Sequence, residues 1–341
     1  MVVRVAINGF GRIGRNFLRA SLSQNCRFEV VAINDLGDGE MLANLLRFDS
    51  LLGRFPGTVR SSRAGLRVND TLITLLSQRD PGQLPWSDLG VDVVVESTGF
   101  FTSREAASAH LDAGATKVVV SAPCGDADGT FVVGVNDDRY RNDRHHVISN
   151  ASCTTNCLAP MARVLDDRFR IEHGLMTTVH AYTGDQQLVD GPHSDLRRAR
   201  AAAINVVPTS TGAAKAIGAV MPRLKGRLDG SALRAPVAGG SLVDLTVLLA
   251  KPADVDVINQ AFREASRRGP LRHVLEFSND PLVSSDIVGS PMSCTFDSGL
   301  TQGSGRLFKV FGWYDNEVGY AHRLADLVDL VGRKLGRRAA R

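Results

Sequence analysis

Three glycines near the start of the chain constrain its fold more than any other feature. Gly9, Gly11 and Gly14 form the pattern G-x-G-x-x-G between the apolar run 2–9 and a segment with helical spacing at 12–22. Glycines at these positions permit a tight turn, a close approach of the backbone to a pyrophosphate, and close packing of the helix on the strand. The pattern therefore predicts a strand, a phosphate-binding turn and a helix whose N-terminus binds a dinucleotide.

An acidic residue supports this interpretation over the alternative, a plain strand–turn–helix with flexible glycines. The next apolar run, 28–35, ends at Asp35, which follows Gly14 by about 20 residues, the usual separation for a ribose-binding acid. A carboxylate there accepts hydrogen bonds from the ribose of NAD and repels the 2′-phosphate of NADP. Because Arg15 or Arg47 could weaken that repulsion, the sequence favours NAD without excluding NADP.

The order of the other apolar runs predicts the fold class. Strand-like runs at 91–98 and 117–123 alternate with helical patterns at 39–49 and 103–115. Such alternation is typical of an α/β protein with a parallel, doubly wound sheet. Residues 50–90 differ, because short β-like pieces and many turn residues there predict a small meander.

The pattern changes after about residue 151, where long β-like runs replace the alternation. The segment 319–335 has apolar residues at helical spacing and would form a closing helix. We therefore predict two domains. The first is a Rossmann-type NAD-binding domain over 1–152, completed by a C-terminal helix at 317–341, and the second is an α+β catalytic domain over 153–316.

Composition narrows the class of protein. Hydrophobic residues make up 43% and charged residues 22% of the 341 residues, which is the balance of a soluble globular protein. The net charge is only +4, without a basic stripe interleaved with aromatic residues, so we expect no nucleic-acid partner. No long apolar run or signal-peptide pattern is present, so we expect no membrane partner. The five cysteines are sparse and odd in number, which favours the reducing cytoplasm.

The stretch ASCTTNC, residues 151–157, holds Cys153 and Cys157. A zinc site needs four ligands, and no second Cys/His pair accompanies these two, so we expect no metal. A disulfide does not suit a reducing compartment. The following residues have helical spacing, which places Cys153 at a helix N-terminus, where the dipole would lower the pKa of its thiol. Cys157 lies one turn deeper and is more typical of a core residue.

The candidate partner of the thiol is His180, at the end of the β-like run 172–183. The other histidines are less favourably placed, and a structural histidine remains the alternative for any one of them. A dinucleotide site and an activated thiol together indicate one reaction type. The thiolate adds to an aldehyde, a hydride leaves to NAD⁺, and a second nucleophile releases the resulting acyl group.

Six motifs in order along the chain resemble the phosphorylating glyceraldehyde-3-phosphate dehydrogenases. The resemblance extends from residue 2 to about residue 335, and it implies oxidation of D-glyceraldehyde 3-phosphate with inorganic phosphate to 1,3-bisphosphoglycerate. The motifs are INGFGRIGR (7–15), SNASCTTNCLAP (149–160), HAYTGDQ (180–186), DLRRARAAA (195–203), PTSTGAAKA (208–216) and WYDNE (313–317).

The resemblance also implies roles for single residues. Cys153 would be the nucleophile, and His180 would act as its base. Arg198 would lie near both phosphate groups, although Arg197 and Arg200 are neighbouring alternatives. The implied NAD contacts are Gly9, Gly11, Arg12, Ile13, Gly14, Asp35, Ser121 and Asn316; the implied inorganic-phosphate contacts are Ser152, Thr154, Thr211 and Gly212; and the implied contacts to the substrate's C3 phosphate are Thr183, Asp185 and Arg234.

The family forms homotetramers, and the segment 184–208 resembles its subunit-interface loop. Pro192 resembles the NAD-preferring form of that loop. Three departures from the family pattern bear on cofactor preference and turnover: Gly37 and Gly191 replace larger residues near the ribose, Val318 replaces an aromatic residue, and 236–240 differs beside Arg234.

Three alternatives stay open. The first is an NADP-preferring enzyme of the gluconeogenic direction, which Gly37 and Gly191 would suit. The second is erythrose-4-phosphate dehydrogenase, against which Thr183 and Thr211 argue, because that relative differs in both of these motifs. The third is a non-catalytic dinucleotide-binding protein, which the presence of both Cys153 and His180 disfavours.

Overall fold

The computed structural model describes residues 2–336, and the chain divides into two compact units. The first unit comprises the chain up to residue 131, residues 139–151, and the part that begins at residue 321. The second unit comprises Val132–Asp138 and Ser152–Tyr320. Residues 337–341 of the predicted C-terminal helix lie outside the described residues.

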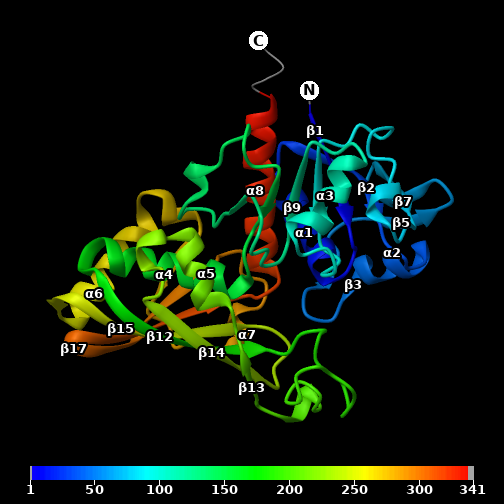
Figure 1. The fold of residues 1–341 in the computed structure, drawn as a ribbon. Coiled ribbons are helices and arrows are strands. Elements are labelled where there is room, and N and C mark those ends of the chain that lie inside the picture. Colours follow the sequence, from blue (N-terminus) through cyan, green and yellow to red (C-terminus); the bar gives the residue numbers. More distant parts are fainter. Residues whose placement is uncertain (1, 337–341) are drawn as a thin grey trace. The chain divides into compact units, whose positions relative to one another are not determined.

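A nine-stranded sheet is the centre of the first unit (Figure 1). Its order is β10-β11-β9-β8-β1-β2-β7-β6-β5, and the neighbouring strands from β10 to β7 are parallel. The predicted doubly wound parallel sheet is therefore confirmed. The strands are β1 (Val3–Asn8), β2 (Phe28–Asn34), β5 (Val59–Ser62), β6 (Gly65–Val68), β7 (Thr71–Leu76), β8 (Val93–Glu96), β9 (Lys117–Val120), β10 (Gly129–Thr130) and β11 (Val147–Ser149), and β3 (Phe48–Asp49) pairs separately with β4 (Gly53–Arg54).

Helices connect the parallel strands. They are α1 (Arg12–Ser23), α2 (Gly39–Arg47) and α3 (Arg104–Asp112), with a short 3-10 turn at Pro81–Gln83. The central strands are apolar on both faces because both faces are buried: Val5, Ala6 and Ile7 in β1 have no exposed surface. The expected meander also exists, since β5, β6 and β7 are antiparallel neighbours, and β7 joins them to β2.

The second unit is built on a six-stranded mixed sheet with the order β13-β14-β12-β15-β17-β16. Both β12–β14 and β16–β17 are parallel, whereas the other pairs are antiparallel. An α+β fold, as predicted, is the result. The strands are β12 (Ile171–Ala181), β13 (Val207–Ser210), β14 (Leu228–Ala235), β15 (Ser241–Ala253), β16 (Leu275–Ser278) and β17 (Cys294–Tyr314).

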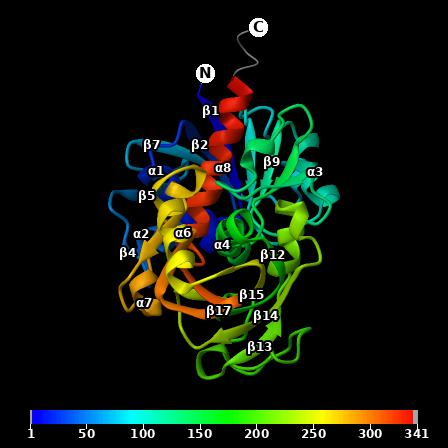
Figure 2. The same cartoon turned by 90° about the vertical axis from the view of Figure 1, so that its left-hand side faces the viewer.

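Helices cover one face of this sheet (Figure 2). Helix α4 (Cys153–Phe169) packs on β15 and β17, helix α6 (Val255–Arg267) packs on β16 and β17, and α5 (Ala213–Val220) packs beside α4. The other face carries exposed apolar side chains, including Leu175, Leu248 and Leu307. Shorter helical pieces are α7 (Ser284–Ile287) and 3-10 turns at Asp137–Arg139, Ala202–Ile204, Pro222–Leu224 and Pro270–His273.

The last helix, α8, spans Val318–Gly336 and confirms the helix expected at 319–335. Leu324, Leu327 and Val331 on this helix are fully buried. Its Gly332 approaches Val3 of β1 so closely that an added Cβ would lie 3.1 Å from the valine side chain. Among the helices of residues 2–336, none is long and apolar enough to cross a membrane.

Candidate active site and dinucleotide site

Glycine suits each of the three positions in the first turn for a different structural reason. Gly9 has φ +91°, and an added Cβ would lie 2.6 Å from the Thr98 backbone nitrogen. A Cβ on Gly14 would collide with the Gly9 carbonyl oxygen, whereas one on Gly11 would meet no atom within 4 Å. Gly11 is also the N-cap of α1. The turn therefore has open space where an anionic group can approach the free N–H groups of the helix.

Asp35 is held at the edge of a cavity of about 430 Å³ in the first unit. Its Oδ2 accepts a hydrogen bond from the Phe10 N–H at 2.7 Å, and its Oδ1 accepts one from the Gly37 N–H at 2.8 Å. Because each carboxylate oxygen can accept a further bond, Asp35 can still bind ribose hydroxyls. The residues around the cavity are Asn8, Gly9, Gly11, Asn34, Asp35, Leu36, Gln78, Arg79, Ser97, Thr98, Phe100 and Phe101. This cradle fits a dinucleotide.

Several of these residues were missed by sequence reasoning. Asn8, Asn34 and Thr98 lie at or just beyond the carboxyl ends of β1, β2 and β8. Their position in the sequence could have been used to predict them, because open parallel sheets bind ligands at the carboxyl ends of their strands.

Of the predicted contacts, Arg12 is in the first turn of α1 and pairs with Asp49.

The predicted cofactor residues Ile13, Ser121 and Asn316 lie elsewhere. Ile13 is in the first turn of α1. Ser121 follows β9 and donates its backbone N–H to the Glu96 carbonyl at 2.9 Å, but does not line the cavity. Asn316 belongs to the second unit, where its Oδ1 accepts a hydrogen bond from Ser241 Oγ at 3.0 Å. Ser241 Oγ also accepts the Ala181 N–H, so Asn316 is tied to the end of β12.

In the second unit, Cys153 and His180 lie together. Helix α4 begins at Cys153, after Ser152, whose Oγ accepts the Thr155 N–H at 3.0 Å as an N-cap. His180 is the second-last residue of β12. The distance from Cys153 Sγ to His180 Nε2 is 3.4 Å. Cys157, one turn into the helix, is fully buried, as expected of a core residue.

The hydrogen bonds of the histidine define its tautomer. His180 Nδ1 lies 2.7 Å from the Ala181 carbonyl oxygen, which can only accept, so Nδ1 carries the proton. The Nε2 lone pair therefore faces Cys153. Arg234 Nη1 lies near Nδ1 but donates to the Ala181 carbonyl at 3.3 Å and to Thr183 Oγ1 at 3.1 Å. His180 is thus arranged to accept the thiol proton.

Burial determines the protonation of this pair. It raises the pKa of Cys153 above its ordinary value, although nearby Arg234 lowers it. Burial, together with the same arginine, lowers the pKa of His180 to about 4. The expectation that the helix start lowers the pKa of Cys153 is therefore wrong for this state, because desolvation of a thiolate outweighs the favourable charges. Both shifts favour the uncharged forms of the two groups, which are a thiol and a neutral imidazole.

Tyr314 contacts Thr154, which follows Cys153 in the chain, and the ring of His180, and it was not assigned a role from the sequence. Its hydroxyl bonds to Thr154 Oγ1 and to Thr178 Oγ1, each at 2.8 Å. Its ring meets the His180 ring edge-on, with centroids 5.8 Å apart. Thr154 is therefore buried with its hydroxyl engaged. Tyr314 lies within the WYDNE motif, which was the available signal.

Four of the predicted anion contacts form one network. Thr183 Oγ1 accepts from Arg234 and donates to Asp185, and Asp185 Oδ2 pairs with Arg198 Nη1 at 2.8 Å. Arg198 Nε donates to Thr209 Oγ1 at 2.9 Å. The neighbouring candidate Arg200 pairs instead with Asp190. Within residues 2–336, Arg198 is thus the candidate arginine that joins this network.

The remaining predicted contacts lie at two adjacent helix N-termini. Gly212 is the N-cap of α5, and Thr211 Oγ1 accepts the Ala213 N–H at 3.2 Å. The Ala213 carbonyl in turn accepts from Thr155 Oγ1, in the first turn of α4, at 3.4 Å. Ser152 and Gly212 therefore cap neighbouring helices. Two helix N-termini side by side provide free N–H groups and positive partial charge for an anion.

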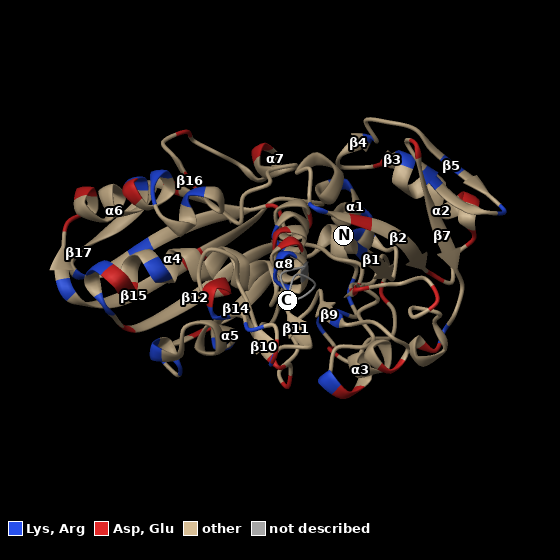
Figure 3. Ribbon diagram, turned by 90° about the horizontal axis from the view of Figure 1, so that it is seen from above, with Lys and Arg blue, Asp and Glu red and all other residues tan. Residues whose placement is uncertain are grey.

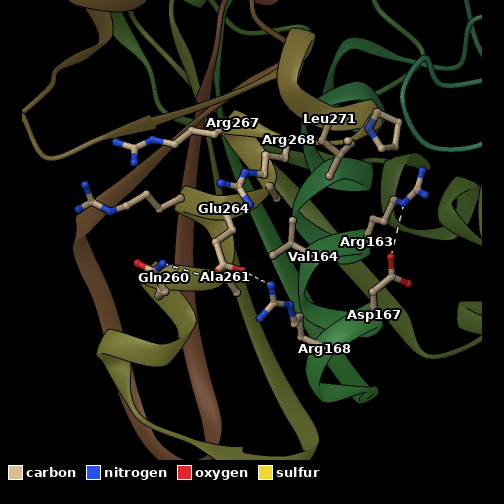
Figure 4. Close-up of a pocket in the computed structure, with 14 residues that line it drawn as sticks. Arg163, Val164, Asp167, Arg168, Gln260, Ala261, Glu264, Arg267, Arg268 and Leu271 are labelled. Atoms are coloured by element: carbon tan, nitrogen blue, oxygen red, sulfur yellow. Dashed lines mark hydrogen bonds and ion pairs between the residues drawn. The ribbon is translucent and has the colours of Figure 1, made fainter.

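A further cavity of the second unit, of about 560 Å³, lies between α4 and α6 and contains none of the predicted residues (Figure 4). Both helices carry basic and acidic residues (Figure 3). Its arginines are partly neutralised, because Arg163 pairs with Asp167 and Arg168 pairs with Glu264. It offers no nucleophile, and we assign it no catalytic part.

The fold and the two sites together define a class of protein: a dinucleotide-dependent oxidoreductase whose second unit carries a cysteine–histidine pair beside anion-binding groups. Comparison with known proteins agrees with this class. Residues 3–104 match the NAD binding domain of glyceraldehyde 3-phosphate dehydrogenase, and residues 152–316 match its C-terminal domain.

Full-length relatives give the same result. The chain is 56% identical to glyceraldehyde-3-phosphate dehydrogenase 2 of Streptomyces arenae, 59% identical to the glyceraldehyde-3-phosphate dehydrogenase of Mycobacterium tuberculosis, and 60% identical to that of Mycobacterium avium. Each match covers 98% of this chain and 100% of the relative. The chain belongs to the glyceraldehyde-3-phosphate dehydrogenase family, whose members are NAD-dependent oxidoreductases.

Proposed function

We propose that the chain oxidises D-glyceraldehyde 3-phosphate to 1,3-bisphosphoglycerate, using NAD⁺ and inorganic phosphate, in glycolysis and gluconeogenesis. The observation that carries this proposal is the 3.4 Å contact of Cys153 Sγ with His180 Nε2. The 2.7 Å contact of His180 Nδ1 with the Ala181 carbonyl oxygen assigns the ring proton to Nδ1 and leaves Nε2 as the acceptor. A thiol beside a neutral base can lose its proton as it attacks, which suits addition to an aldehyde.

In the first step, Cys153 gives its proton to His180 Nε2 as Sγ bonds to the aldehyde carbon. The carbonyl electron pair moves to the oxygen, which takes that proton and completes the hemithioacetal. The Cys153 backbone N–H, at the start of α4, would stabilise the developing charge on this oxygen. Arg234 and Thr183 would hold the substrate's C3 phosphate, and Arg198 would lie near both anions.

The second step makes a thioester. Bound NAD⁺ would supply the hydride acceptor for this oxidation, held by Gly9, Gly11, Gly14 and Asp35 in the first unit. His180 takes the hydroxyl proton of the hemithioacetal as the carbonyl re-forms.

Inorganic phosphate, bound by Ser152, Thr211 and Gly212, then attacks the thioester carbon. The carbon–sulfur bond breaks, and the Cys153 thiolate regains its proton from His180.

We propose that NAD is preferred over NADP. Asp35 keeps its carboxylate at the cavity edge through the Phe10 and Gly37 N–H groups. An added Cβ on Gly37 would lie 2.6 Å from Met41 Cε and 3.1 Å from Asp35 Oδ1. Met41 Cε is the end of a flexible, half-exposed side chain that can move aside, so the Asp35 carboxylate is the closer constraint on a side chain at position 37. The glycine at position 37 does not by itself argue for a 2′-phosphate site.

We also propose the domain division 1–152 with 317–341, and 153–316, and assembly into a homotetramer. Supporting the assembly, the uncovered face of the second sheet exposes 68% of Leu175 and 57% of Leu307. The segment 184–208 exposes 82% of Leu188 and 83% of Leu196. Exposed apolar clusters of this kind mark protein interfaces. The five free cysteines suit a cytoplasmic location.

Trapping the acyl-enzyme tests the reaction. Incubation with glyceraldehyde 3-phosphate and NAD⁺, without phosphate, should leave one acyl group on the peptide that contains Cys153, detected by mass spectrometry and removed when phosphate is added. Cys153→Ser should abolish the adduct. Cys157→Ser is the matched control and should retain it. An adduct that survives Cys153→Ser would contradict the assignment.

A further inference from the structure

A buried chain of polar side chains runs through the first unit toward the dinucleotide cavity. It begins at Trp86, whose Nε1–H lies 3.0 Å from His110 Nδ1. His110 Nε2 lies 3.1 Å from Glu96 Oε2. Trp86 and His110 have no exposed surface, and Glu96 is 2% exposed. None of these three residues lines the cavity.

The direction of each hydrogen bond in this chain is fixed. An indole N–H can only donate, so His110 Nδ1 is an acceptor and the ring proton is on Nε2. That proton points to Glu96 Oε2, which also accepts from Asn8 Nδ2 at 2.6 Å. The other carboxylate oxygen, Oε1, accepts from both the Thr98 N–H, at 2.8 Å, and the Thr98 hydroxyl.

Glu96 therefore faces four donors and no acceptor. Because an ionised carboxylate can only accept hydrogen bonds, Glu96 determines how the neighbouring amide groups are oriented. With Nδ2 committed to Glu96, Asn8 presents Oδ1 to Asn34 Nδ2 at 2.7 Å. Asn34 then exchanges two hydrogen bonds with the Gln78 backbone, each at 2.8 Å. The chain thus crosses the carboxyl ends of β8, β1 and β2.

Every residue at the far end of this chain lines the cavity: Asn8, Asn34, Gln78 and Thr98. The chain also supports the aromatic wall, because the His110 ring meets the Phe101 ring edge-on, with centroids 6.4 Å apart. Within the described residues, no Lys or Arg pairs with Glu96. The burial of this carboxylate is therefore not explained by an ionic partner. Its two oxygens instead accept hydrogen bonds from the donors around the cavity.

We propose that Glu96, oriented by His110 and Trp86, is a positioning residue for the dinucleotide: it fixes the Asn8 and Asn34 amides and the Thr98 turn in the arrangement that binds NAD. Replacing the carboxylate by an amide places an N–H₂ group opposite two donors, whichever way the amide turns. At least one of the cavity-lining groups must then rotate or lose its partner.

The test measures NAD binding by titration calorimetry and the kinetic constants of the full chain. Glu96→Gln should raise the Kd for NAD by about tenfold or more, which equals the loss of roughly one buried hydrogen bond. The KM for NAD should rise in parallel, whereas the KM for glyceraldehyde 3-phosphate should stay within about twofold. A purely structural role would instead lower Tm and leave the Kd for NAD unchanged well below Tm.

Two further variants act at a distance from the cavity. His110→Gln keeps an N–H donor toward Glu96 and should bind NAD nearly as well as the unmodified chain, whereas His110→Leu removes the donor and should bind several-fold more weakly. Val91→Ala is the control for lost packing, because Val91 belongs to the same buried cluster as Trp86 but has no polar group. It should lower Tm without changing the Kd for NAD. Unchanged NAD binding in both Glu96→Gln and His110→Leu would overturn the proposal, as would an equal loss in Val91→Ala.

Discussion

The proton between Cys153 and His180 is the central feature at the residue scale. Burial raises the pKa of the thiol and, with Arg234, lowers that of the imidazole to about 4. Both shifts favour a neutral pair, in which His180 Nε2 can accept the thiol proton. These two shifts favour transfer of the thiol proton to His180 Nε2 during attack over a thiolate formed beforehand.

Replacing the base tests this account. His180→Asn should lower kcat by roughly 10²–10⁴-fold, the usual contribution of a general base. Alkylation of Cys153 by iodoacetamide should slow at neutral pH and recover only at high pH, where the partly buried thiol ionises without help. His273→Asn, on an exposed 3-10 turn, is the control and should leave both rates within about twofold. An unchanged kcat in His180→Asn would make His180 a structural residue.

The Asp35 carboxylate governs the choice of dinucleotide in this account. Asp35→Ala should weaken NAD binding and narrow the preference for NAD over NADP, since both ribose acceptors and the repelling charge are lost. Asp38→Ala is a matched control, because Asp38 caps α2 by accepting the Glu40 and Met41 N–H groups. It should lower stability by about 1 kcal/mol and leave the NADP/NAD ratio of kcat/KM unchanged. A ratio that is also unchanged in Asp35→Ala would contradict the assignment.

Single reactive residues were predictable from the sequence where they lie in a short, recognisable motif. Cys153 and His180 were chosen from their local patterns, and the structure brings them together. Tyr314 also lies in a short motif, WYDNE, but its role was not predictable, because its partners Thr154 and Thr178 come from elements distant in the sequence. The Glu96 hydrogen bonds escaped detection for the same reason. The direction of the Cys153 pKa shift was wrong because burial cannot be read from a spacing.

At the scale of elements, the N-termini of α4 and α5 lie beside each other and form the proposed inorganic-phosphate site. Ser152→Ala removes the N-cap of α4 and should destabilise the protein by about 1 kcal/mol. It should also raise the KM for phosphate, because a donor and the order of the helix start are both lost. Ser103→Ala removes the equivalent cap of α3, whose Oγ accepts the Ala106 N–H, and should leave that KM unchanged. Equal effects of the two variants on the KM for phosphate would contradict the site.

The regular elements of the first unit were predictable because apolar runs and turn residues coincide there. The helix expected at 103–115 is Arg104–Asp112, and the strand expected at 91–98 is Val93–Glu96. The long strand β17, Cys294–Tyr314, was not identified. Its glycines and its exposed middle, where Gly303 and Gly305 have positive φ, interrupt the alternation on which strand prediction relies.

At the scale of the whole molecule, the uncovered face of the second sheet supports the proposed tetramer. Leu307→Glu on β17 should yield smaller assemblies in sedimentation, since burying an unpaired charge at an interface is unfavourable. Val257→Glu is the control. It changes a half-exposed valine on α6, the helix that covers the opposite face, and should leave the assembly intact. A Leu307→Glu variant with unchanged mass would argue against this face as the interface.

The class of the molecule was predictable from the order of its elements and motifs, and the family matches over residues 3–104 and 152–316 agree with it. Assembly was expected only from the resemblance, because a sequence does not state which apolar residues remain exposed after folding. Leu175 and Leu307 became recognisable as surface residues only in the structure.

A spectrophotometric assay of the purified protein with glyceraldehyde 3-phosphate tests the proposed reaction. NAD⁺ and NADP⁺ are compared side by side, each with and without inorganic phosphate. We expect NADH formation that depends on phosphate and a much higher kcat/KM with NAD⁺ than with NADP⁺. Sustained turnover without phosphate would contradict the proposed phosphate site. Faster turnover with NADP⁺ than with NAD⁺ would contradict the proposed role of Asp35.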